Sequence, residues 1–369
     1  MACEEVYDSG ETKIYRFIAV GAGHISDHWL PLFSDQQSKI FGVNKRVELV
    51  ALVDPDKSVW EKAQKYGCGE TPCFVQLEDA YKEIDCDAVL ILTPPQYHAR
   101  YIWEAIQNLN NVLTEKPFVT EPNDLKHMIK MLPEIKENNL LCVVNQQYRW
   151  APRIQAVRKA IDDGLIGDVG FVVSYFNEAD YHFNLWWRQL HGDISAFNWF
   201  VHHYDTMRYI LKNRKPVEVY AKLIRVPYSK IVGESTVFLN VTFEDGIEWA
   251  YNGSQEGRGW TTPGQSMFTI HGSEGMIENP RDGPPVLYKG TDEEGTPLMD
   301  DPGDSHAPYP DYWHVTLRKF IESLDAKQPI DEDLTTFENN MWTISIPLAA
   351  RESHRQKRRI NMKEYLDSL

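Results

Sequence analysis

The fold of this chain is decided by residues 14–26, which read Ile-Tyr-Arg-Phe-Ile-Ala-Val-Gly-Ala-Gly-His-Ile-Ser. The first seven residues are largely apolar, partly β-branched and closed by Gly21, a pattern typical of a buried strand. The segment after Gly23 predicts the start of a helix. Glycines at such a turn let backbone N–H groups and the helix dipole meet a pyrophosphate without interference from side chains. We therefore expect a first strand–helix unit that binds a dinucleotide.

The glycines match the common dinucleotide motif G-x-G-x-x-G only in part. Gly21 and Gly23 occupy the first two positions, and Ser26 occupies the third, where a small residue still allows close helix packing. A glycine pair alone is equally compatible with an ordinary tight turn. The predicted strand before it and helix after it favour dinucleotide binding.

Further apolar runs end at residues that could bind a ligand. Residues 47–53 end at Asp54, residues 87–92 end at Thr93-Pro94-Pro95, and the run 111–114 ends at Glu115-Lys116-Pro117. Helical patterns such as 58–66 and 99–106 lie between the strands, so we expect a parallel sheet. Ligands of such a sheet bind at the carboxyl ends of its strands.

Asp54 predicts the type of dinucleotide. Its carboxylate can accept hydrogen bonds from both ribose hydroxyls and would repel a 2′-phosphate, which favours NAD over NADP. Asp54 lies 54 − 23 = 31 residues after Gly23, more than the usual spacing of about 20, so we assume an insertion between about residues 27 and 46. The alternative is a turn residue at the end of a strand.

The pattern changes in the second half of the chain. A strand at 140–145 leads into Gln146-Gln147-Tyr148-Arg149-Trp150, and Pro152 suits the start of a helix that Gly164 and Gly167 end. Five alternating runs then predict a second, largely antiparallel sheet, at residues 169–176, 217–225, 235–243, 247–251 and 267–271. We expect a loop over 279–310 and helices over 312–325 and 335–354.

Composition limits the partners of the chain. With 369 residues it is long enough for two domains, and 38 basic minus 54 acidic residues give a net charge of −16, which disfavours nucleic acid and anionic membranes. No run of about 18 apolar residues offers a membrane span. The five cysteines are scattered without zinc-type spacing and the first residues are acidic and polar, so we expect a cytoplasmic protein that binds a small molecule.

Lys116 and His202 are the candidate catalytic residues. The Lys116 amine can exchange a proton with a substrate hydroxyl. Asn198, His202 and Asp205 are four and three residues apart, so they share a face if residues 195–211 are helical, although a single histidine is as often structural. A metal site that includes His182, His191 and His203 is the alternative, but the spacing does not support it and we expect no metal.

Taken together, these segments resemble the glucose-fructose oxidoreductase and inositol dehydrogenase family, often called Gfo/Idh/MocA. The resemblance covers nearly the whole chain. Its residues are Gly21 to Ser26, Asp54, Thr93-Pro94-Pro95 with His98, Glu115-Lys116-Pro117, Tyr148-Arg149-Trp150 with Pro152, Gly164 to Gly167, and His202 with Asp205. It implies an α/β fold: a Rossmann NAD-binding domain at residues 1–145, and an α/β domain at 146–369 that binds substrate and forms oligomers through an open, mostly antiparallel sheet.

The resemblance also implies the chemistry. Family members mostly oxidise or reduce a carbon that bears oxygen on a sugar, an inositol or a related polyol, and Lys116 and His202 match the residues that act on this oxygen. A cis peptide bond is expected before Pro117. The cofactor-binding residues implied by the motifs are Gly21, Gly23, His24, Ile25, Asp54, Thr93, Pro94, His98, Glu115 and Lys116.

One position departs from the family pattern. Where the family commonly has aspartate four residues before the histidine, this chain has Asn198, which can hydrogen-bond a hydroxyl but cannot act as a base. Lys116 or His202 must then handle the proton, with Asp193 as a possible substitute acid. The expected substrate-binding residues are Asn198, Tyr148, Arg149, Trp187, Arg188 and Asp193. Trp186, Trp199 and Trp260 suit either a sugar face or the core.

We therefore expect an NAD-dependent oxidoreductase that transfers hydride between the nicotinamide and a secondary alcohol of a sugar, glycoside or polyol. One alternative is a glycoside 3-dehydrogenase, or an NAD-dependent redox-neutral glycosidase that acts through a 3-keto intermediate. Another is a non-catalytic NAD-binding sensor. We expect a homo-oligomer.

Overall fold

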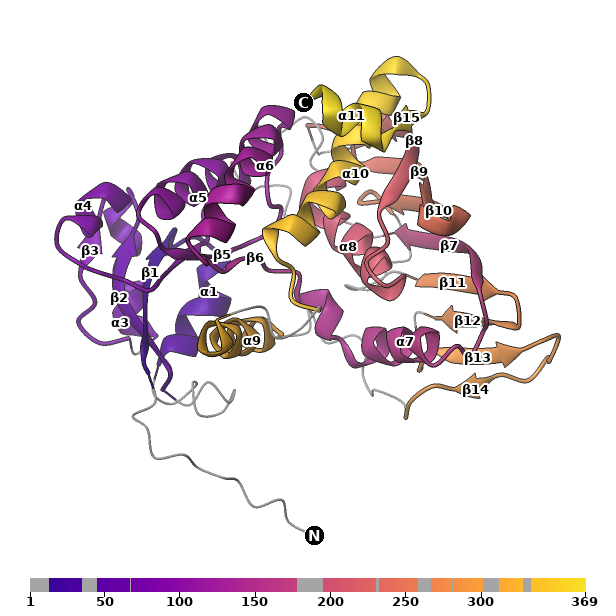
Figure 1. Cartoon of the computed structure of the whole chain (residues 1–369), viewed down its shortest axis with the longest axis horizontal. Helices are drawn as coiled ribbons and strands as arrows, with labels where there is room; N and C mark the ends of the chain where they lie inside the picture. The colour runs from indigo at the N-terminus through magenta and orange to yellow at the C-terminus, as the bar shows by residue number, and fades with distance from the viewer. Residues whose placement is uncertain are drawn as a thin grey trace, which may run out of the picture.

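The computed structural model describes residues 13–34, 45–66, 68–177, 195–229, 232–257, 267–280, 282–300, 312–327 and 333–369. Two β-sheets lie side by side, and helices pack between and around them (Figure 1). No helix among the described residues is long and apolar enough to cross a membrane.

The first sheet has six parallel strands in the order β3-β2-β1-β4-β5-β6. The strands are β1 (Tyr15–Val20), β2 (Val47–Val53), β3 (Cys73–Phe74), β4 (Ala88–Ile91), β5 (Asn111–Thr114) and β6 (Cys142–Val144). Both faces of the central strands are buried, which explains their nearly continuous apolar runs. The strand order reverses between β1 and β4, the place where such sheets bind dinucleotides. The expected Rossmann architecture is confirmed.

Helices cover both faces of this sheet. The helices on one face are α5 (His98–Gln107) and α6 (Pro122–Glu137). Smaller elements connect the strands: α1 (Ser26–Trp29), η1 (Leu30–Phe33), η2 (Lys57–Val59), α3 (Lys62–Lys65), α4 (Leu77–Tyr81) and η3 (Pro95–Tyr97). The helix after the glycines is only one α-helical turn. Pro31 has no N–H with which to continue the α-helical ladder, and the chain changes to the 3-10 turn η1.

The helix α9 (Trp313–Ala326) packs against the other face of the first sheet, although it follows the second sheet in the sequence. Leu317 and Phe320 are buried with Phe17 of β1, and the Tyr15 hydroxyl donates to the Asp325 carboxylate at 2.8 Å. Figure 1 shows α9 beside α1. The chain therefore returns to its first domain to complete that domain's core.

The second sheet has nine strands in the order β14-β13-β12-β11-β7-β10-β9-β8-β15. The strands are β7 (Val169–Asn177), β8 (Pro216–Ile224), β9 (Thr236–Phe243), β10 (Glu248–Ser254), β11 (Met267–Gly272), β12 (Gly275–Asn279), β13 (Val286–Lys289), β14 (Thr296–Pro297) and β15 (Ile360–Asn361). Only β7 and β10 pair in parallel. The expected strands are present. The prediction of a loop over 279–310 was wrong at β13 and β14, because strands of four and two residues are too short to show a clear alternation.

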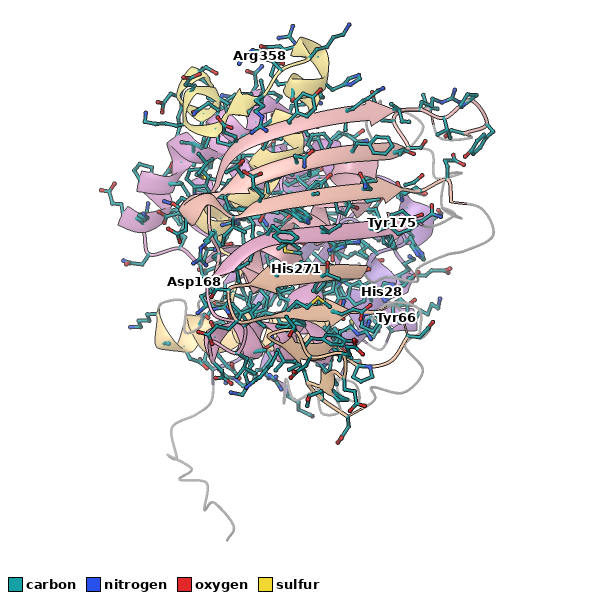
Figure 2. All side chains as sticks on the ribbon, turned by 90° about the vertical axis from the view of Figure 1, so that its right-hand side faces the viewer. His28, Tyr66, Asp168, Tyr175, His271 and Arg358 are labelled. Atoms are coloured by element: carbon teal, nitrogen blue, oxygen red, sulfur yellow. The ribbon has the colours of Figure 1, made fainter. Side chains whose placement is uncertain are left out.

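One face of the second sheet is covered and the other is open. The helices of this domain are α7 (Pro152–Asp162), α8 (Val201–Ile210), α10 (Phe337–Gln356) and α11 (Met362–Ser368), and a π-helical turn, η6 (Ser195–Trp199), leads into α8. In β7, Val172 and Phe176 face the helices and are buried, whereas Phe171, Val173 and Tyr175 are exposed. Figure 2 looks onto the open face, where Tyr175 and His271 lie.

Candidate active site

The glycine loop passes close to the end of β4. Gly21 has a φ of +99°, and a Cβ there would lie 2.8 Å from the backbone of Leu92 and Thr93, so only glycine fits. A Cβ on Gly23, by contrast, would meet no atom within 4 Å. The loop therefore combines a tight contact with the sheet and open space at Gly23, which a cofactor needs for close approach to the backbone.

Asp54 is fixed beside this loop. Its Oδ2 accepts a hydrogen bond from the Ala22 N–H at 2.7 Å, and its Oδ1 accepts one from the Asp56 N–H at 2.8 Å. Each carboxylate oxygen can accept a further hydrogen bond. The position and remaining acceptor capacity of Asp54 fit the ribose hydroxyls of a dinucleotide.

His98 joins the ends of two strands. Its ring nitrogens lie 2.7 Å from the Pro117 carbonyl oxygen and 2.8 Å from that of Thr93, and the side chain is fully buried. The peptide bond between Lys116 and Pro117 is cis, as the family resemblance implies. His98 thus positions the segment that carries Lys116, and both its nitrogens contact the protein, in contrast to the cofactor contact that we expected.

Glu115 is an anchor for the same segment. Its Oε1 accepts hydrogen bonds from Trp29 Nε1 (2.8 Å), Trp313 Nε1 (2.9 Å) and Asn145 Nδ2 (2.9 Å), and its Oε2 accepts from the Lys116 N–H (3.1 Å). The side chain is buried. These contacts join β5 to α1, α9 and the end of β6. We therefore assign Glu115 a positioning role in place of the expected contact with the cofactor.

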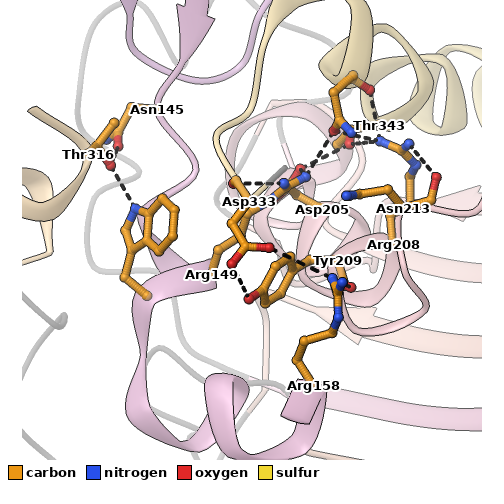
Figure 3. Close-up of polar contacts among 12 residues, drawn as sticks. Asn145, Arg149, Arg158, Asp205, Arg208, Tyr209, Asn213, Thr316, Asp333 and Thr343 are labelled. Carbon is orange, nitrogen blue, oxygen red and sulfur yellow. Dashed lines mark hydrogen bonds and ion pairs between the residues drawn. The ribbon is translucent and has the colours of Figure 1, made fainter. Parts of the chain in front are cut away.

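A chain of hydrogen bonds extends this anchor toward the second domain. Trp150 Nε1 donates to Thr316 Oγ1 at 2.9 Å, and Thr316 Oγ1 donates to Asn145 Oδ1 at 2.9 Å. Figure 3 shows the link between Thr316 and Asn145. Since Asn145 in turn donates to Glu115, the chain holds α9 and the start of the second domain against the Lys116 segment.

Lys116 and His202 lie close enough for the Lys116 charge to act on the imidazole. His202 is buried in α8, and its pKa lies well below the ordinary value, first because burial disfavours the charged ring and second because the Lys116 charge opposes protonation. The imidazole stacks on the Tyr148 ring, with centroids 4.3 Å apart and planes 9° apart. Its Nδ1 has no hydrogen-bond partner in the described part of the chain. His202 is therefore a neutral imidazole beside an amine.

A buried ion pair holds α8 in place. Arg149 donates to both carboxylate oxygens of Asp205, at 2.5 and 2.8 Å, and Thr343 Oγ1 donates to the same carboxylate at 3.0 Å (Figure 3). The guanidinium also donates to the Asp333 carbonyl and to Asn339 Oδ1, each at 3.1 Å. Asp205 lies three residues after His202, so the pair orients that histidine. With four hydrogen bonds to the protein and full burial, Arg149 positions α8, and its expected hydrogen bond to substrate stays a prediction.

Sequence reasoning missed Gln146. In the sheet register Ile91 pairs with Thr114 and Thr114 with Val144, and Thr93, Lys116 and Gln146 each lie two residues past these last pairs. Gln146 is 2% exposed, and both its amide atoms are without a partner among the described residues, as is Thr93 Oγ1. Register counting from three correctly predicted strands is the signal that points to this set.

Some expected residues cannot be placed. Trp187, Arg188 and Asp193 lie outside the described residues, as do Trp186, Trp260, His182 and His191, and of Asn198 only the backbone is described, in η6. The remaining expected residues flank the glycine loop and the end of β4: His24 and Ile25 precede α1, and Pro94 precedes η3.

Comparison with protein families identifies the chain. Residues 15–145 match the model described as "Oxidoreductase family, NAD-binding Rossmann fold", and residues 154–278 match the "GFO/IDH/MocA C-terminal domain". The chain belongs to the Gfo/Idh/MocA family. It is an NAD-dependent oxidoreductase, and the glycine loop, Asp54 and the buried Thr93 hydroxyl fit that cofactor.

Individual relatives agree with this assignment. Inositol 2-dehydrogenase of Rhizobium meliloti is 28% identical over 273 residues, which cover 72% of this chain and 76% of the relative. Two solved structures superpose with a TM-score of 0.79 and 17% identity, over 95% of this chain and 99% of theirs. One is an oxidoreductase from Agrobacterium radiobacter in complex with NAD+, L-tartaric acid and magnesium. The other is levoglucosan dehydrogenase in complex with NADH.

Proposed function

We propose that this protein transfers hydride between NAD and a secondary alcohol of a sugar, glycoside or polyol. The observation that carries the proposal is the effect of the Lys116 charge on the neutral, buried His202, which makes the two side chains neighbours, in a protein whose glycine loop fits NAD. The similarity to inositol 2-dehydrogenase supports a polyhydroxylated substrate.

The two side chains handle the proton of the reaction. The glycine loop and Asp54 would hold NAD+, which would supply the hydride acceptor for oxidation of the secondary alcohol to a ketone, with NADH as the second product. The hydroxyl proton passes to the neutral imidazole of His202, which has a ring nitrogen without a protein partner. The Lys116 amine donates a hydrogen bond to the oxygen and stabilises the negative charge that develops there. Two positive charges side by side are unfavourable, which keeps His202 neutral before the reaction.

The experiment uses NADH absorbance at 340 nm. The purified protein is mixed with NAD+ and myo-inositol, D-glucose, levoglucosan or methyl β-D-glucoside. We expect turnover of at least one of them and a loss of more than about 10³-fold in kcat for Lys116→Met, with NADH affinity within about threefold of wild type. Lys130→Met, on the exposed side of α6, is the matched control and keeps full activity.

Three outcomes separate the alternatives. Full activity of the Lys116→Met variant would overturn the proposed role of Lys116. Release of methanol from the methyl glucoside without net NADH would favour the redox-neutral glycosidase, whereas NADH with an intact 3-keto glycoside would identify a 3-dehydrogenase. Firm NADH binding with no turnover of any compound would favour the sensor.

We also propose that a second copy of the chain covers the open face of the second sheet. Phe171, Val173 and Tyr175 of β7 and Phe238 of β9 are 44–47% exposed on this face. An apolar patch of this kind on a sheet is typical of a subunit interface. Sedimentation of wild type and Tyr175→Glu tests it: the wild type should be oligomeric and the variant should dissociate, and a monomeric wild type would contradict the proposal.

A reducing, cytoplasmic location is the last part of the proposal. Cys68, Cys73, Cys86 and Cys142 are free thiols in the structure. Burial raises the pKa of Cys68 to about 11, so this thiol stays protonated and unreactive at neutral pH. We expect equal activity with and without reductant. A loss of activity on addition of reductant would show that the protein needs a disulfide and would contradict the proposal.

A further inference from the structure

The Gln146 side chain differs from the polar residues next to it. The Asn145 amide donates to Glu115 Oε1 at 2.9 Å and to Gln147 Oε1 at 3.2 Å. Gln146 is equally buried, yet neither its amide nitrogen nor its oxygen has a partner among the residues that the structure describes. A buried polar group without a hydrogen bond is destabilising. Such a group is available to hydrogen-bond a ligand.

The sheet register places this unpartnered amide beside Lys116. Thr114 of β5 pairs with Val144 of β6, and Lys116 and Gln146 each lie two residues past this last pair of the two neighbouring strands. Glu115 and Asn145 bond each other, whereas the Lys116 charge acts on His202 of α8, so Lys116 lies toward α8. Gln146 is two residues before Tyr148, whose ring stacks on His202.

The position of Gln146 in the sheet distinguishes substrate from cofactor. The glycine loop and Thr93 follow β1 and β4, on one side of Lys116. Gln146 follows β6, the edge strand on the other side, and leads directly into η4 (Gln147–Trp150), where Tyr148 stacks on His202. The amide thus lies on the side of Lys116 away from the dinucleotide loop and next to the second domain.

We propose that Gln146 binds the substrate through the hydroxyl group next to the carbon that is oxidised. This inference rests on the proposed function. A carboxamide both donates and accepts a hydrogen bond, and so does a hydroxyl, so the two groups are complementary. The protein then selects neutral compounds with two adjacent free hydroxyls, as in sugars and inositols, over analogues that lack the second hydroxyl.

The test compares kcat/KM for D-glucose and myo-inositol with kcat/KM for their monodeoxy analogues, in wild type and in Gln146→Met. Methionine keeps the length of the side chain without its hydrogen bonds. We expect wild type to prefer a parent compound over the analogue that lacks the neighbouring hydroxyl by about 10- to 100-fold. In the variant, kcat/KM for the parent should fall to the value for the analogue, and kcat/KM for the analogue should stay within threefold of wild type.

Controls separate a lost contact from a lost fold. Asn110→Leu removes a buried carboxamide next to the amino end of β5, at the opposite end of the strand from Lys116, and should keep the wild-type preference. Gln146→Asn, which retains both hydrogen-bonding functions on a shorter side chain, should restore part of the preference. NADH affinity, measured by fluorescence, should stay within threefold of wild type in all variants.

The outcomes are distinct. A Gln146→Met variant that still discriminates against the analogue as wild type does would overturn the inference and leave the proposed function intact. A more than tenfold loss of NADH affinity in that variant would assign Gln146 to the cofactor and overturn it as well. A wild-type protein that turns over none of the compounds would contradict the proposed function, and with it this inference.

Discussion

The two sides of the Glu115–Lys116 dipeptide differ in whether their polar groups have partners. On the Glu115 side, the Trp29 and Trp313 indoles and the Asn145 amide converge on one carboxylate oxygen. On the Lys116 side, Thr93 Oγ1, the Gln146 amide and His202 Nδ1 are buried without a partner in the described part of the chain. Buried polar groups in proteins are nearly always hydrogen-bonded. The first side therefore serves the fold, and the second is prepared for ligands.

The segment that follows β5 serves both purposes, because Glu115 bonds Asn145 whereas Lys116 lies toward His202. The Glu115 carboxylate is bound by α1, α9 and β6, and this fixes the backbone from which Lys116 projects. On the other face, α8 delivers His202 and is itself held by the pair of Arg149 and Asp205. A rigid support on one face lets the opposite face keep unsatisfied groups in fixed positions.

The largest effect is expected from a change on the ligand side. His202→Phe keeps a ring that can stack on Tyr148 and removes both ring nitrogens. Because the proton acceptor is lost, we predict that kcat falls by about 10²- to 10⁴-fold. NADH affinity should stay within threefold. Steady-state kinetics on the best compound of the panel, with fluorescence titration of NADH, provide the measurement.

His203→Gln is the matched control for this prediction. His203 is the next residue, also buried, and hydrogen-bonds the Tyr251 hydroxyl at 2.7 Å instead of facing Lys116. The control should retain activity at neutral pH. Equal kcat values for wild type and His202→Phe would show that the ligand side lacks the proposed proton acceptor.

A change on the anchor side should affect stability. Glu115→Ala leaves two indole N–H groups and an amide without their acceptor, so we predict that the free energy of unfolding falls by about 3–5 kcal/mol. Glu115→Gln retains an oxygen at the same place and should lose about 1–2 kcal/mol. Urea denaturation measures both values. A loss below 1 kcal/mol for the alanine variant is incompatible with an anchor.

The smallest effect concerns the pH dependence of stability. Burial lowers the pKa of His203 to about 3, against about 6.5 in an unfolded chain, so the unfolded state binds more protons between these values. Stability that is present above pH 6.5 is therefore lost as the pH falls toward 3. Between pH 7 and pH 5 this histidine should account for about 2 kcal/mol. Urea denaturation at both pH values should show that His203→Gln loses that much less than wild type, and an unchanged loss would refute the assignment.

The main strands of both sheets could be predicted because their patterns are local. The uniform apolar runs of β1, β2 and β4 and the alternation in β7 follow directly from burial on two faces or on one. The short strands β13 and β14 carry no such pattern. The packing of α9 on the first sheet was also not predicted, because it depends on contacts such as Tyr15 with Asp325, more than 300 residues apart.

The candidate site could be predicted only where a motif marks it. Lys116 lies in a recognisable triplet, and His202 lies at a helical spacing from Asp205, so both were singled out. Arg149 is also a candidate from the sequence, but its ion pair with Asp205 could not be predicted, because it depends on how α8 packs. Gln146 carries no motif. Gln146 becomes a candidate because β5 pairs with β6 and because its amide has no hydrogen-bond partner among the described residues. Only the folded structure contains both observations.

The central claim is that Lys116 and His202 flank the carbon that is oxidised. A crystal structure of the protein with NADH and myo-inositol tests it most directly. We predict that one hydroxyl oxygen of the polyol lies within about 3.2 Å of both Lys116 Nζ and a His202 ring nitrogen. A polyol bound against other residues, with neither side chain within reach of its oxygens, would contradict the claim.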